Sequence, residues 1–99
     1  MVSNMGQKSV MTTDHEHCFI CGRYVAHPEW HHIFGGANRI NSEKYGLKVP
    51  LCHWCHNEPP DGVHFNREKM DELKAAGQRK FESIASHEEF MRIFGENYI

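Results

Sequence analysis

Two C-x-x-C pairs restrict the folds open to this chain more than any other feature of its sequence. Cys18 and Cys21 form the first pair and Cys52 and Cys55 the second, with 30 residues between the pairs. Each pair can present two thiolates from one tight turn, and two such turns together give the four-sulfur tetrahedral site that zinc favours. We therefore predict that the four cysteines bind one structural Zn²⁺.

Two other interpretations of the cysteines are a disulfide-bonded secreted protein and free buried thiols. Disulfides belong to oxidising compartments, but the first 17 residues are polar and lack the apolar segment of a secretory signal. No stretch approaches the length of a membrane span. The sequence therefore predicts a soluble, cytoplasmic protein with reduced cysteines. Zinc would contribute about 10 kcal/mol to the folding of a chain too short for a large apolar core.

The sequence predicts a single domain of the α+β class with three parts. Residues 1–13 are polar and are expected to form a flexible tail, residues 14–66 the zinc-stapled core, and residues 67–99 helices that pack on this core. In the core, "WHHIF" and "LKVPLC" have the composition of strands, and residues 35–46 between them are expected to form a loop. Because the zinc site joins the flanks of both segments, we expect an antiparallel hairpin.

The last third of the chain has helical periodicity. Asn66 is a predicted N-cap for a helix from Arg67 to about Ala85. Ser86 followed by Glu89 is a capping-box pattern for a second, shorter helix. The predicted buried face of the longer helix consists of Met70, Leu73, Gly77, Phe81 and Ile84.

Nine of the 99 residues are histidine, the commonest metal ligand and a natural proton acceptor near neutral pH. His31 and His32 are adjacent on the predicted first strand, where neighbouring side chains point to opposite faces. One of them can therefore bind a metal while the other stands beside the site as a general base. His56 begins a predicted helical turn after the second cysteine pair, and it can share a cation with His31 and with His64.

The segments "CFIC", "WHHIFGG" and "LKVPLCHWCH" together resemble the HNH (His-Asn-His) endonuclease family. More narrowly, they are similar to small phage and prophage members in which paired zinc knuckles bracket the active site. The resemblance covers residues 18 to about 65, or to about 82 in its narrower form. It implies a ββα-metal fold, hydrolysis of phosphodiester bonds in DNA, and a cytoplasmic location in a bacterial or phage-infected cell. A protein partner in phage recombination or packaging is a further expectation.

The resemblance also implies roles for individual residues. His31 and His56 match the metal-ligand positions, His32 matches the general base, and Asn41, preferred over Asn38, matches the middle asparagine. The expected catalytic cation is Mg²⁺ or Mn²⁺, with Zn²⁺ or Ni²⁺ as alternatives because nitrogen ligands suit them. A backbone carbonyl is expected to fix the tautomer of His32.

One departure from the family and the charge of the chain bear on substrate binding. Relatives often carry a lysine three residues after the last histidine, where this chain has Pro59, so His64 becomes a candidate third ligand or phosphate contact. Arg39 and Lys44 are further candidate phosphate contacts, and Lys74 is expected on the solvated face of its helix. A net charge of −2 is not that of a protein which holds DNA by bulk electrostatics. The competing interpretation is a non-catalytic zinc module that binds DNA or a protein.

Overall fold

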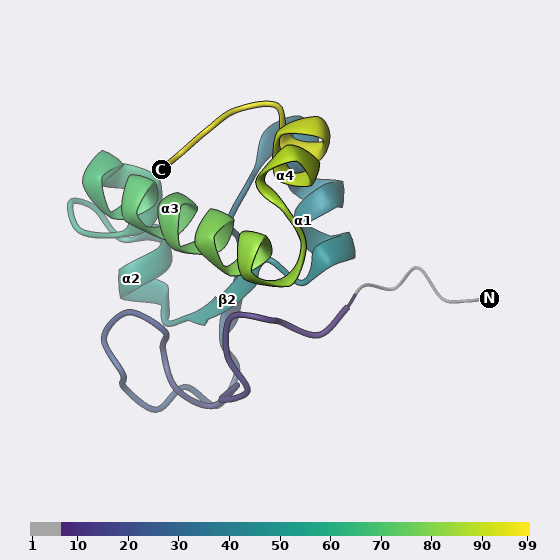
Figure 1. The fold of residues 1–99 in the computed structure, drawn as a ribbon. Helices are drawn as coiled ribbons and strands as arrows, with labels where there is room; N and C mark the ends of the chain where they lie inside the picture. The colour runs from purple at the N-terminus through teal and green to yellow at the C-terminus, as the bar shows by residue number, and fades with distance from the viewer. Residues whose placement is uncertain (1–6) are drawn as a thin grey trace.

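The computed structural model describes residues 7–99, so the first six residues of the predicted tail lie outside the described part. Strand β1, Glu29–His32, pairs with strand β2, Lys48–Leu51, in an antiparallel sheet with His31 opposite Val49. Helices follow and flank this sheet (Figure 1). The predicted hairpin and the α+β class are confirmed.

The connection between the two strands is helical, and the prediction of a loop over residues 35–46 is wrong. It contains a 3₁₀ turn, Gly36–Asn38, and helix α1, Arg39–Tyr45. The hydroxyl of the buried Ser42 accepts a hydrogen bond from the N–H of Phe34 at 2.9 Å and donates one to the Phe34 carbonyl at 2.8 Å. This contact holds α1 against the hairpin. The exposed face of α1 is polar, so the composition of the segment indicated a loop.

Residues 7–13, predicted to be part of the flexible tail, include a segment that packs against the end of α1. The N–H of Val10 donates a hydrogen bond to the carbonyl of Gly46 at 2.9 Å. Gly46 ends α1 with a φ of 71°, and a Cβ at this position would clash with the carbonyl of Lys8. Glycine is therefore required here both for the left-handed backbone and for the close approach of the N-terminal segment.

The second cysteine pair starts helix α2, His53–Asn57. The helix thus begins three residues before the predicted start at His56. The sulfur of Cys52 accepts a hydrogen bond from the N–H of Cys55 at 3.4 Å and so acts as the N-cap of the helix. A 3₁₀ turn, Val63–Phe65, then connects α2 to the C-terminal helices.

Two helices, α3 at Arg67–Ile84 and α4 at His87–Phe94, complete the chain. The side chains of Asn66 and Ser86 accept hydrogen bonds from the backbone three residues further on, which confirms both predicted N-caps. The residues predicted to form the buried face of α3 are buried or half-buried up to the last turn of the helix. There Ile84 is 65 % exposed, because the helix ends at this residue.

The core lies where the hairpin meets α3 and α4. The ring of Phe34, just after β1, contacts those of Phe90 and Phe94 at centroid distances of 5.5 and 4.8 Å. A Cβ on Gly77 of α3 would lie 3.1 Å from Ile33 and 3.2 Å from Phe34, so α3 crosses this part of the chain very closely (Figure 1). Within the described residues, no helix combines the length and the apolar character needed to cross a membrane.

Candidate metal centres

The two cysteine pairs come together as a four-sulfur cluster. The four Sγ atoms all lie within 4.8 Å of one another, and those of Cys21 and Cys52 are 3.8 Å apart. Burial raises the pKa of the Cys18 thiol, but hydrogen bonds from the backbone at Cys21 and Cys52 outweigh it and lower this pKa to about 6. Such backbone donors stabilise the thiolate that binds a metal. The four predicted ligands are therefore close enough together to bind one zinc ion.

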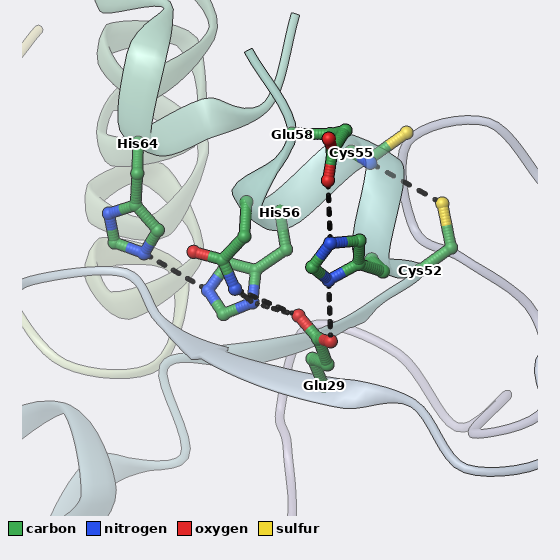
Figure 2. A network of polar contacts seen from close by, with 8 residues as sticks. Glu29, Cys52, Cys55, His56, Glu58 and His64 are labelled. Carbon is green, nitrogen blue, oxygen red and sulfur yellow. Dashed lines mark hydrogen bonds and ion pairs between the residues drawn. The ribbon is translucent and has the colours of Figure 1, made fainter.

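Three histidines form a second cluster. His31 comes from β1, His56 from α2, and His64 from the 3₁₀ turn that follows α2. One ring nitrogen from each lies within 4.8 Å of the other two. Figure 2 marks the contact between the Nε2 atoms of His56 and His64, which are 3.0 Å apart. The His31 ring centroid is 5.2 Å from both rings. The structure thus brings together the three histidines predicted to share a cation.

The environment of His31 fits a bound cation. This residue is only 3 % exposed, and its Nε2 has no hydrogen-bond partner within residues 7–99. Burial, followed by the neighbouring His56 and His64, lowers the pKa of His31 to about 3, so the ring is neutral at pH 7. A buried polar atom without a partner costs about 1–3 kcal/mol, and a neutral imidazole nitrogen is a good metal ligand. A cation between the three rings would satisfy this nitrogen.

Glu29, which the sequence analysis did not single out, orients His56. Its Oε1 accepts hydrogen bonds from Nδ1 of His56 and from the amide of Asn57, both at 2.9 Å (Figure 2). The hydrogen bond with His56 is also the main cause of the lowered pKa of Glu29. A proton on Nδ1 leaves Nε2 of His56 free to bind a cation. Strand alternation could have found this residue, because Glu29 and His31 are two positions apart and share a face.

His32, the predicted general base, contacts a carboxylate rather than a backbone carbonyl. Its Nε2 lies 2.6 Å from Oε1 of Glu43, and Oε2 of Glu43 accepts a hydrogen bond from Nζ of Lys48 at 2.7 Å. The hydrogen bonds with Lys48 and then with His32 lower the pKa of Glu43, so this carboxylate is ionised at neutral pH. The prediction that a backbone carbonyl contacts the His32 ring was wrong, because Glu43 lies on α1, in the segment predicted to be a loop.

An open pocket of about 400 Å³ lies beside His32, the predicted base, and beside two histidines of the cluster, His31 and His64. His31, His32 and His64 all line it, although His31 and His32 are neighbours on one strand. Lys74 of α3 and Tyr98 of the C-terminal segment form part of the opposite wall. Lys74, predicted to belong to the solvated face of its helix, is half-buried and lines this open pocket. A ligand in this pocket can therefore reach His32 and the histidine cluster at the same time.

The remaining predicted site residues do not line this pocket. Nδ2 of Asn41 donates hydrogen bonds to Oδ1 of Asn38 at 2.9 Å and to the carbonyl of Ile93 at 3.4 Å, so Asn41 connects α1 with α4. Arg39 and Lys44 are exposed on α1. Of the two candidate asparagines, only Asn38 is part of the pocket wall.

No protein-family model, curated protein or solved structure matches this chain. The motif residues and the geometry of the two clusters are therefore the basis for assigning a function. Two carboxylates outside the sequence motif are part of this geometry. Glu29 contacts Nδ1 of His56, and Glu43 contacts Nε2 of His32.

Proposed function

We propose that this protein is a metal-dependent DNA endonuclease of the HNH type, which hydrolyses phosphodiester bonds. The observation that carries the proposal is the buried Nε2 of His31, which has no hydrogen-bond partner among residues 7–99. This ring is one of the three clustered imidazoles and lies beside His32 in one open pocket. A purely structural zinc module needs only the four cysteines, and it would have no use for this second cluster.

Two different metal sites follow from the two donor sets. The four thiolates suit a structural Zn²⁺, which holds the ends of the hairpin together. The second site offers three imidazole nitrogens from His31, His56 and His64, and this donor set suits Zn²⁺, Ni²⁺ or another transition metal better than Mg²⁺. Mn²⁺ is the better fit of the two cations expected from the family resemblance. When bound, the cation would neutralise negative charge that develops on the scissile phosphate.

His32 is the proposed general base. Because Glu43 takes the proton-bearing Nε2, Nδ1 of His32 is the nitrogen available to accept a proton from the attacking water. The water oxygen then bonds to phosphorus, the bond between phosphorus and the 3′-oxygen breaks, and the departing 3′-oxygen takes up a proton from solvent water. The carboxylate of Glu43 stabilises the imidazolium that forms, and the paired Lys48 holds this carboxylate in place. The family resemblance implies 5′-phosphate and 3′-hydroxyl ends.

Nicking of supercoiled plasmid tests the proposal. Wild type, His32→Ala and His87→Ala are compared in Mn²⁺, Zn²⁺, Ni²⁺ and Mg²⁺ at matched zinc content of the cysteine site. His87 is a suitable control because it is exposed and, among the described residues, its ring makes a polar contact only with Glu82. We expect nicking by the wild type and by His87→Ala, and none by His32→Ala.

Two results would contradict this proposal. Equal nicking by all three proteins would mean a contaminating nuclease or a different base. No nicking by any of them, on plasmid or on single-stranded and branched DNA, would favour the non-catalytic zinc module that binds DNA or a protein.

A further inference from the structure

The pocket beside the histidine cluster has an unusual balance of charge. Its ionisable lining groups are the three histidines His31, His32 and His64 together with Lys74 and Tyr98, and among the described residues no aspartate or glutamate lines it. In a chain with a net charge of −2, a pocket with a lysine and no carboxylate is a local positive site.

Lys74 is available to a ligand in this pocket. Within residues 7–99 it makes no ion pair, whereas Lys48 is held by Glu43 and Lys69 donates a hydrogen bond to a backbone carbonyl. Its Nζ lies 5.4 Å from the centre of the Tyr98 ring. A cation–π contact of this kind positions an ammonium group without neutralising it.

A buried glutamine fixes this wall of the pocket. Gln78, one helical turn after Lys74, is fully buried, and its Oε1 accepts a hydrogen bond from the N–H of Tyr98 at 2.6 Å. Its Nε2 donates a hydrogen bond to Oδ1 of Asn97 at 2.7 Å. The C-terminal segment therefore returns from α4 to α3, as Figure 1 shows, and the Tyr98 ring contacts Phe34 in the core. The Tyr98 ring that lies against Lys74 is thus held in place by hydrogen bonds of the C-terminal segment to α3 and by packing on Phe34.

We infer that Lys74 binds a phosphate group of the nucleic-acid strand in this pocket, next to the histidine cluster. The inference rests on the proposed function, since it identifies the substrate as a strand whose phosphate enters between β1 and α3. The apolar surface of Met70 and Tyr98 beside the lysine suits the sugar or the base of the same nucleotide. A volume of about 400 Å³ leaves room for more than the phosphate alone.

The test measures binding without cleavage. Protein with one equivalent of Zn²⁺, which fills the four-thiolate site first, is titrated with a short single-stranded oligothymidylate at several salt concentrations. Wild type is compared with Lys74→Gln, Lys74→Arg and the matched control Lys80→Gln, which removes an exposed lysine from the same helix. Ring signals of Tyr98 in NMR spectra report whether the ligand occupies the pocket, and thermal unfolding checks that each variant is folded.

We expect Lys74→Gln to bind about tenfold more weakly. For this variant, the slope of the logarithm of the oligothymidylate binding constant against the logarithm of the salt concentration should be smaller in magnitude by about 0.7. This is the contribution of one phosphate contact to a single strand. Lys74→Arg should retain the slope, and Lys80→Gln should match the wild type. Equal loss in Lys74→Gln and Lys80→Gln, unchanged binding in Lys74→Gln, or no binding to the wild type would overturn the inference.

The outcomes also separate the inference from the proposed function. Binding that depends on Lys74, with no nicking by the wild type, would support the phosphate site and reject the endonuclease. Nicking that depends on His32, with normal oligonucleotide binding by Lys74→Gln, would support the endonuclease and reject the phosphate site.

Discussion

Glu29 accepts a hydrogen bond from Nδ1 of His56 at 2.9 Å, and this contact leaves Nε2 of His56 facing Nε2 of His64, 3.0 Å away. A strand residue thereby orients a helix residue toward a third element of the structure. The arrangement is that of a carboxylate behind a metal-binding imidazole, which fixes the tautomer and raises the basicity of the ligand.

Glu29→Gln should therefore weaken cation binding at the histidine cluster by roughly 10–100-fold, while zinc in the cysteine site is unaffected. Competition with a chromophoric chelator measures the affinity of each site. Glu88→Gln is the control, because Glu88 is an exposed carboxylate in the first turn of α4 and contacts no histidine of the cluster among the described residues. Equal affinity in the wild type and in Glu29→Gln would show that the carboxylate is only a surface contact.

Glu43→Gln should lower the nicking rate by about 10²-fold at unchanged metal content, because the imidazolium of His32 loses its carboxylate. A structural role alone would not change the protonation pattern of one ring. Long-range ¹⁵N NMR of the His32 ring should show Nε2–H in the wild type and a mixture of tautomers in Glu43→Gln. Normal activity of Glu43→Gln would remove Glu43 from the proposed mechanism.

Loss of the two metal sites should have different effects on stability. The Cys52→Ser protein should be unfolded at 37 °C and show no cooperative thermal transition, because a structural zinc contributes about 10 kcal/mol to folding of a small domain. His64→Ala should retain a cooperative transition, because this ring is exposed and comes from a short turn. Circular dichroism during heating compares the two variants. A folded Cys52→Ser protein would contradict a structural role for the four-sulfur site.

His31 should stay neutral from pH 8 to pH 5 when the histidine cluster holds no cation, since burial lowers its pKa to about 3. The unfolded chain takes up this proton near pH 6.5, so His31 lowers the stability of the folded state as the pH falls from about 6.5 towards 3. ¹⁵N shifts of the ring measured on protein with one equivalent of Zn²⁺ give the titration directly. A midpoint near 6.5 would mean that His31 is solvated and not held in a dry site.

Gly77→Ala should destabilise the protein by about 1–2 kcal/mol, even though alanine favours a helix by about 1 kcal/mol. The new methyl would lie 3.1 Å from Ile33 and 3.2 Å from Phe34, closer than packed atoms normally approach. Gly35→Ala is a control, because a Cβ there has no neighbour within 4 Å. Urea unfolding of both variants measures the difference, and a more stable Gly77→Ala would show that α3 can shift away from β1.

The local sequence was enough to predict the parts of this protein in which the information lies within a few residues. The spacing of Cys18, Cys21, Cys52 and Cys55 predicted the four-sulfur cluster, and the caps at Asn66 and Ser86 predicted where the last two helices begin. These features depend on turn geometry and on hydrogen bonds to the next three residues, which are the same in most folds.

Tertiary structure alone decided the partners of the histidines. Glu43 reaches His32 because Ser42 holds α1 on the hairpin, where composition indicated a loop. Lys74 faces the pocket because the neighbouring Gly77 lets α3 approach Phe34 so closely. Such contacts join residues that are far apart in the chain, and their energy comes from packing and burial that no local pattern records.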